Sequence, residues 1–197
     1  MTRHARLAHL VLLPVLALST AGCADDPKPR GFSDPEDARQ GRELALAFQK
    51  ALRSELENAI AAQGPIGAIA VCGERAQAIA DGLARDGMRV RRISDRPRNP
   101  ANAADARELQ MLESWRGTPA ERRAGLGEAR TRDGTSRLYL PISIPDALCL
   151  TCHGPVEAMA PELREKLAAR YPADRATGYA LGDLRGALVV ESGGTAR

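Results

Sequence analysis

Apolar residues recur at every fourth position over one long stretch near the start of the chain. This spacing is typical of a helix that buries one face, and it predicts a helix from Pro35 to Gln63. Ser33 and Asp34 precede this stretch, and either residue type can cap a helix N-terminus. A second helix is predicted from Pro65 to Arg85. The two apolar stripes consist of Leu44, Phe48, Leu52, Leu56 and Ile60 and of Ile69, Cys72, Ala76, Ile79 and Leu83.

Shorter apolar runs in the rest of the chain predict strands at 88–94, 137–144 and 183–191. Side chains alternate between the two faces of a strand, so one face of the last strand is predicted to carry Leu184, Leu188 and Val190. Further helices are predicted at 105–115 and 156–170. Because helices come first and strands are scattered later, the pattern predicts an α+β domain with an antiparallel sheet and a long N-terminal helix.

Residues 1–22 have the pattern of a bacterial export signal. A basic start without acidic residues precedes the apolar run 10–18, which is too short to cross a bilayer stably as a helix. The following Thr20-Ala21-Gly22-Cys23 resembles a lipobox, although Thr20 stands where leucine is usual. We therefore expect Cys23 to receive lipid and to become the new N-terminus. The alternative is ordinary cleavage after Ala21, which would leave Cys23 as a free thiol.

The residues after the signal give the expected location and boundaries. An aspartate directly after the lipidated cysteine would favour the inner membrane, and Ala24 therefore favours the outer membrane. We expect an exported lipoprotein that faces the periplasm and is held at the membrane by its lipid. Residues 23–34 are expected to form a tether, 35–191 one domain and 192–197 a C-terminal tail.

Charge and composition narrow the classes of partner. The formal net charge of +3 falls to +1 once Arg3 and Arg6 leave with the signal. A nearly neutral domain lacks the positive charge of a nucleic-acid-binding protein, so no nucleic-acid partner is expected. Aromatic residues make up only 3% of the chain, so the core must consist of smaller aliphatic side chains.

One short motif carries specific chemistry. Cys149-Leu150-Thr151-Cys152-His153 is a C-x-x-C-H pentad, the attachment site of a c-type haem. Two intervening residues let both thiols reach the same porphyrin edge, where they form thioethers. The histidine follows at once and comes under the iron as its proximal ligand. The pentad therefore predicts one covalently bound haem c.

The remaining cysteines and histidines restrict the second axial ligand. Only His153 remains after His4 and His9 leave with the signal, so a bis-histidine haem within one chain is excluded. Cys72 lies on the apolar face of its predicted helix, and as a thiolate ligand it would favour ferric iron. The alternative is that Cys72 is a small buried hydrophobic residue. The sequence leaves these candidates for the sixth position: Cys72, Met88, Met111, Met159, a lysine, water or no ligand.

Arginines crowd the segment around the first predicted strand. Arg91 and Arg92 are expected on opposite faces of that strand, so one of them can reach inward to a haem propionate. We take Arg91, Arg92 and Arg98 as candidate haem-binding residues. The alternative is a solvated basic edge strand that resists aggregation.

The chain resembles a family of exported c-type haem domains with mixed Cys/His iron ligation, formerly classed as domains of unknown function. The segments that carry the resemblance are Ala70-Val71-Cys72-Gly73, Val90-Arg91-Arg92-Ile93-Ser94, Arg98-Asn99-Pro100-Ala101-Asn102, Cys149 to Gly154 and Tyr171 to Ala187. The resemblance implies a PAS-like fold, in which helices flank an antiparallel sheet, with Cys72 and His153 as iron ligands. It also implies a role in redox sensing or electron transfer. Ala104 and Arg107 depart from the family pattern, which usually has a proline and an aromatic residue there.

Three classes of function compete. The first is a non-enzymatic haem protein that senses redox state or carries electrons, with an unidentified redox or signalling protein as its partner. The second is a haem enzyme such as a peroxidase, which needs an open iron face with distal acid–base groups. The third is a zinc protein, because the chain also contains a possible Cys3His ligand set in Cys72, Cys149, Cys152 and His153.

Overall fold

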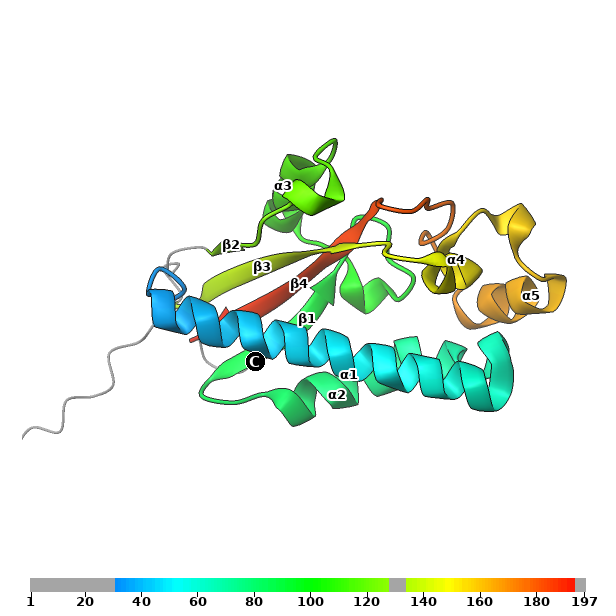
Figure 1. Ribbon diagram of the computed structural model, residues 1–197, viewed down its shortest axis with the longest axis horizontal. Helices are drawn as coiled ribbons and strands as arrows, with labels where there is room; N and C mark the ends of the chain where they lie inside the picture. Colours follow the sequence, from blue (N-terminus) through cyan, green and yellow to red (C-terminus); the bar gives the residue numbers. More distant parts are fainter. Residues whose placement is uncertain (1–30, 128–133, 194–197) are drawn as a thin grey trace, which may run out of the picture.

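The computed structural model describes residues 31–127 and 134–193. The predicted signal and most of the tether lie outside these residues. The long helix α1 runs from Pro35 to Gly67, and the Asp34 side chain caps it by accepting the backbone N–H of Glu36 at 2.8 Å. The helix is interrupted at Gly64, where φ is 68°, directly before Pro65. The predicted end of the first helix therefore coincides with this interruption (Figure 1).

The second predicted helix, 65–85, is not continuous. After α1, a single π-helical turn, η1, spans Val71–Arg75, and the regular helix α2 covers only Ala76–Leu83. A π-helical turn inserts one extra residue per turn and commonly marks a functional position. The periodicity of the apolar stripe did not reveal this turn, which contains Cys72.

Four antiparallel strands form one sheet in the order β1-β4-β3-β2. They are β1 (Met88–Ile93), β2 (Leu126–Gly127), β3 (Ser136–Ser143) and β4 (Leu184–Ser192). The three predicted strands are all present, and β2 is a short addition at the edge. Because β4 includes Ser192, the predicted C-terminal tail begins inside the last strand.

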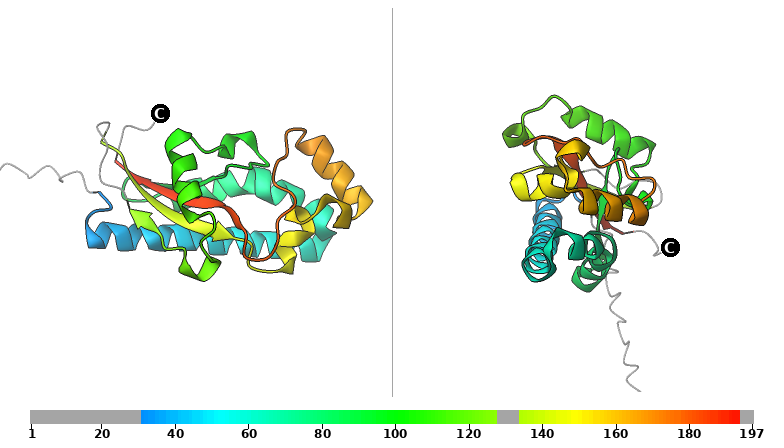
Figure 2. Two further views of the ribbon diagram at one scale, coloured as in Figure 1. Left: turned by 90° about the horizontal axis from the view of Figure 1, so that it is seen from above. Right: turned by 90° about the vertical axis from the view of Figure 1, so that its right-hand side faces the viewer.

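The sheet lies between two helical layers (Figures 1 and 2). Helices α1 and α2 cover one face, where Leu188 and Val190 join their core cluster. Helix α3, Ala106–Trp115, covers the other face and packs on Ala187 and Val189. Leu184 also belongs to this second cluster, so the prediction that it shares a face with Leu188 was wrong. A β-bulge between Ile142 and Ser143 shifts the register and reverses the alternation.

The end of the domain that carries the C-x-x-C-H pentad lies beyond the sheet, above the C-terminal half of α1 (Figure 1). Helix α4 covers Ala147–His153, followed by the 3-10 turn η4 (Val156–Ala158) and helix α5 (Pro161–Arg170). The predicted helix 156–170 is thus two elements, because Pro161 starts a new helix. Two further 3-10 turns are η2 (Pro100–Asn102) and η3 (Ala120–Arg122). The α+β prediction, with its antiparallel sheet and long N-terminal helix, is confirmed.

None of the helices within 31–127 and 134–193 is long and apolar enough to cross a membrane.

Candidate functional site

A large cavity opens where α1, η1, the end of the sheet and α4 meet. Its volume is about 1370 Å³, including the part that opens to solvent. Leu52, Leu56 and Ile60 of α1 line it, and so does Phe48, whereas Leu44 of the same apolar stripe is fully buried in the core. The stripe predicted from the sequence therefore serves two purposes. Leu44 and Phe48 pack on the sheet, and the stripe from Phe48 onward forms an apolar wall for the cavity.

The pentad forms helix α4, and local contacts fix both of its ends. At the start, the Asp146 carboxylate accepts the backbone N–H of Leu148 at 3.1 Å, and Arg53 of α1 pairs with Asp146 at 2.8 Å. At the end, the Gly154 N–H donates to the Leu150 carbonyl at 2.8 Å. A Cβ atom at Gly154 would come within 2.6 Å of that carbonyl oxygen, so this close turn requires glycine.

The imidazole of His153 has a fixed tautomer. Its Nδ1 lies 2.7 Å from the backbone carbonyl oxygen of Ala176, and because a carbonyl can only accept, Nδ1 carries the proton. The Nε2 atom therefore keeps its lone pair. Burial, together with the positive charges of Arg185 and Arg98, lowers the pKa of His153 well below its usual value. The ring is thus neutral and suited to bind a metal through Nε2.

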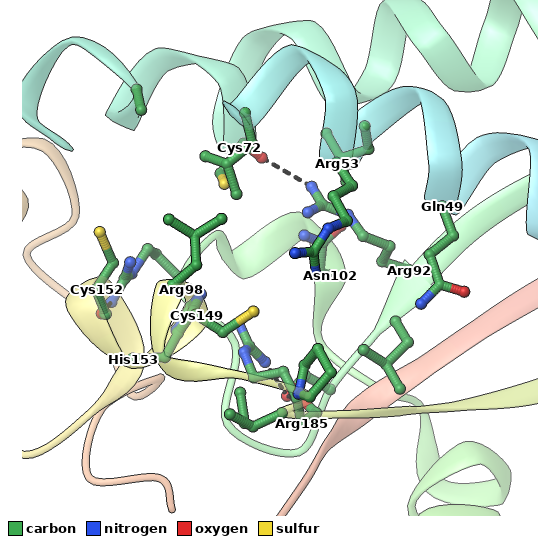
Figure 3. Close-up of a pocket in the computed structure, with 18 of the residues that line it drawn as sticks. Gln49, Arg53, Cys72, Arg92, Arg98, Asn102, Cys149, Cys152, His153 and Arg185 are labelled. Atoms are coloured by element: carbon green, nitrogen blue, oxygen red, sulfur yellow. Dashed lines mark hydrogen bonds between the residues drawn. The ribbon is translucent and has the colours of Figure 1, made fainter. Parts of the chain in front are cut away.

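Cys72 reaches the same cavity from the other side, on the π-helical turn η1 (Figure 3). Its backbone carbonyl accepts a hydrogen bond from Arg92 at 2.8 Å. The hydroxyl of Tyr171 is buried beside the neighbouring Gly73, where a Cβ atom would lie only 2.3 Å from it. Among the described residues this hydroxyl has no hydrogen-bond partner. The side of the cavity near Cys72 therefore holds a polar group that a bound ligand can satisfy.

None of the three methionine candidates for the sixth ligand lines the cavity, and neither does any lysine. Met88 belongs to the core between the sheet and α1, Met111 packs with the α3 cluster, and Met159 packs near α5. Within the described part of the chain, Cys72 is the protein ligand candidate that the cavity brings opposite α4.

The thiols of the three described cysteines, Cys72, Cys149 and Cys152, form no disulfide. Burial raises the pKa of the thiols of Cys149 and Cys152, so both favour the protonated form. No three of the described histidine, cysteine, aspartate and glutamate side chains lie close enough together to hold a metal ion. The Cys3His zinc alternative is therefore not assembled by this fold.

The three arginines predicted to bind haem lie in different places. Arg91 does not line the cavity and instead pairs with Glu108 and Glu191 on the α3 face. Arg98 lines the cavity, but it pairs with Asp174 at 2.8 Å and donates to backbone carbonyls. Arg92 lines the cavity and makes no ion pair with a carboxylate among residues 31–127 and 134–193.

The sequence analysis missed Arg185, which also lines the cavity. Arg185 donates to the Ser94 hydroxyl at 2.9 Å and lies over the ring of Tyr179, 5.5 Å from its centroid. It is the extra residue at the β-bulge, between the paired positions Leu184 and Gly186. Burial lowers the pKa of both Arg92 and Arg185. The resemblance covered this segment, but only the bulge turns Arg185 toward the cavity.

The residues present fit a covalently bound haem. The cavity has an apolar wall, two thiols two residues apart and a neutral imidazole directly after them. Among the described residues, the buried hydroxyl of Tyr171 has no hydrogen-bond partner, and Arg92 and Arg185 of the cavity have no carboxylate partner.

Comparisons with known proteins agree with this architecture. The model of the Tll0287-like family matches residues 35–192. Among solved structures, the chain is similar to the crystal structure of the cyanobacterial heme-protein Tll0287, with a TM-score of 0.59 and 22% sequence identity. That match covers 80% of this chain and 94% of the other and concerns the fold. No curated protein matches the chain. Because the family match spans most of its length, the chain belongs to the Tll0287-like family.

Proposed function

We propose that this protein is a mono-haem c-type redox protein, with the haem held by thioethers to Cys149 and Cys152 and its iron bound by His153. The observation that carries the proposal is that α4 presents both thiols and a neutral imidazole, oriented by Ala176, to a single large cavity. The family match and the fold shared with a heme-protein support the same cofactor. When bound, the haem supplies a one-electron couple.

Cys72 is proposed as the second axial ligand. It lies on a π-helical turn across the cavity from α4, and the methionine and lysine alternatives do not reach the cavity. A thiolate donates electron density and therefore stabilises the ferric state. Since Cys72 would occupy the face that a peroxidase needs for distal acid–base groups, this ligand set favours electron transfer or redox sensing over enzymatic catalysis.

The cavity supplies positive charge for the two propionates through Arg92 and Arg185. Each of these side chains is partly buried, and neither has a carboxylate partner within the described residues. Guanidinium groups bind carboxylates through two parallel hydrogen bonds, which is the interaction a propionate offers. Arg185 takes the place that the sequence analysis assigned to Arg91.

The predicted lipid signal supports a location of this redox site at a membrane surface. In this proposal Cys23 anchors the domain on the periplasmic side of the outer membrane, and residues 24–34 connect the two. The partner is a redox or signalling protein at the same membrane.

The test is spectroscopy of the exported holoprotein. The chain is expressed with a cytochrome maturation system, and covalent haem is measured after denaturation. Native ferric spectra are then compared between the wild type, Cys72→Ala and the control Met159→Leu. We expect one covalent haem per chain in all three, and a low-spin thiolate spectrum that only Cys72→Ala abolishes. A colourless wild type would refute the haem assignment, and an unchanged Cys72→Ala spectrum would reject the ligand.

A further inference from the structure

We infer that Arg98 is a positioning residue that fixes the His153 imidazole and tunes its strength as a ligand. The inference rests on the proposed function, because it concerns the histidine expected to bind iron. It also reassigns Arg98, which the sequence analysis took as a direct haem contact.

The guanidinium of Arg98 connects both sides of the His153 environment. Its Nη2 donates to the carbonyl of Cys152, the residue before the histidine. The same nitrogen lies 3.4 Å from the carbonyl oxygen of Ala176, which is the oxygen that accepts the His153 Nδ1–H. One side chain therefore joins the end of α4 to the segment that orients the imidazole.

Asp174 completes the arrangement. One carboxylate oxygen accepts from Arg98 Nε at 2.8 Å, and the other accepts the backbone N–H of Ala176 at 2.8 Å. The side chains of Arg98 and Asp174 are only 8% and 12% exposed, so solvent screens this pair weakly. Asp174 thus holds the backbone N–H of Ala176 and Arg98 its backbone carbonyl, so the two peptide groups that flank Ala176 are both fixed.

This network affects the ligand strength of the imidazole. A carbonyl that accepts from the histidine pulls on the Nδ1 proton and makes Nε2 a stronger donor. A guanidinium on the same carbonyl draws electron density away and weakens that pull. Its positive charge, beside the oxygen that accepts from His153, also disfavours further positive charge on a metal bound to the imidazole. Both effects favour the reduced state, so removal of Arg98 is expected to lower the midpoint potential.

Arg96 offers a matched control. It binds the same segment from its exposed side, where its Nε donates to the Arg175 carbonyl at 3.2 Å and its Nη2 donates to the Thr177 carbonyl. It therefore holds the carbonyls on either side of Ala176 but not the oxygen that accepts from His153. Loss of Arg96 removes one guanidinium from the segment without touching the His153 hydrogen bond.

The experiment compares holoproteins of the wild type, Arg98→Gln, Arg98→Lys, Arg98→Gln/Asp174→Asn and Arg96→Gln. Midpoint potential and ferric electron paramagnetic resonance g-values report on the iron environment, and thermal unfolding reports on the fold. We expect Arg98→Gln to lower the potential and shift the g-values, and Arg96→Gln to leave both close to the wild type. Arg98→Lys keeps the positive charge but loses the several N–H donors of the guanidinium. Its potential should therefore return part of the way to the wild-type value, whereas its g-values should stay shifted.

Each outcome decides the inference. A shift that persists in the double variant shows that the unpaired Asp174 charge is not its cause. Equal shifts in Arg98→Gln and Arg96→Gln would overturn the inference, as would a lower unfolding temperature with an unchanged potential and unchanged g-values. If Arg98→Gln yields no folded holoprotein, Arg98→Lys decides the matter, and g-values identical to the wild type refute the role. Absence of haem from the wild type itself would instead refute the proposed function.

Discussion

Arg91 and Arg92 are neighbours on β1, yet they lie in opposite electrostatic settings. Arg91 projects to the α3 face, where it pairs with Glu108, which is 1% exposed, and with Glu191 at 3.2 Å. Although burial opposes the charged form, these two carboxylates raise the pKa of Arg91. Arg92 projects into the cavity, where burial lowers its pKa and its hydrogen-bond acceptor is the Cys72 carbonyl.

The contrast distinguishes Arg91, whose charge is neutralised within the fold, from Arg92, whose charge is available to bind a ligand. Burying an ion costs several kcal/mol unless an opposite charge accompanies it, as an order of magnitude. On the α3 face, the chain supplies both partners of each pair. On the cavity face, Arg92 and Arg185 have no carboxylate partner among the described residues, and two propionates would supply the matching negative charge. Neighbouring residues of one type therefore have different roles because a strand alternates its faces.

The largest expected effect comes from removing the proposed haem attachment point on the cavity side. Cys149→Ala/Cys152→Ala should abolish covalent haem completely, because no thioether can form. The α3 face and the main core contain neither cysteine, so the apoprotein should still fold. Haem staining of denatured protein and circular dichroism measure the two properties. Cys72→Ala serves as the control that keeps covalent haem, and pigment retained by the double variant would contradict attachment at α4.

The two neighbouring arginines can be compared directly in this haem-free variant. Arg91→Met leaves Glu108 buried without its partner and should lower the free energy of unfolding by about 2 kcal/mol. Arg92→Met removes a cation without a carboxylate partner and should leave stability unchanged or raise it by about 1 kcal/mol. Urea unfolding measures both values. Equal destabilisation by the two substitutions would remove the distinction between the two faces.

Much of this architecture could be predicted from the sequence, because local patterns determine it. Four-residue spacing predicted α1, the predicted boundary between Gln63 and Pro65 coincides with its interruption, and short apolar runs predicted the three main strands. The pentad gave the expected cofactor attachment, since that spacing follows from the chemistry of the porphyrin edge. None of these predictions needs knowledge of which distant segments meet.

The remaining features depend on long-range geometry. The π-helical turn that carries Cys72 keeps the same apolar residues as a regular helix, so periodicity cannot reveal it. Arg185 faces the cavity because of a β-bulge against β3, and this register is set by strand pairing. The sequence made Arg98 a candidate haem-binding residue, but in the structure its donors bind Asp174 and two backbone carbonyls. The role of Arg98 depends on Asp174, Cys152 and Ala176, which lie more than 50 residues away in the sequence.

The smallest expected effect tests the ion pairs of the α3 face by pH. Burial alone would raise the pKa of Glu191, but Arg91 and Arg89 more than offset it and hold the pKa below its usual value. The folded state therefore binds this proton more weakly than the unfolded chain does. The resulting stabilisation is present above the unfolded pKa of about 4.5 and is lost as pH falls through the folded pKa. Unfolding free energies of the wild type should fall across this range.

Glu191→Gln should flatten this part of the pH profile, because glutamine does not titrate, while the exposed control Glu165→Gln should keep the wild-type slope. Urea unfolding at intervals between pH 6 and pH 3 measures the difference in the haem-free variant, so that propionate titration does not contribute. Arg91→Met should flatten the profile in the same direction because it removes one of the cations that lower the Glu191 pKa. Arg92→Met should not, since Arg92 projects from the other face of β1. A flattened profile for both arginine variants would mean that the two faces share one electrostatic network, and the assignment of Arg92 to a ligand would lose its basis.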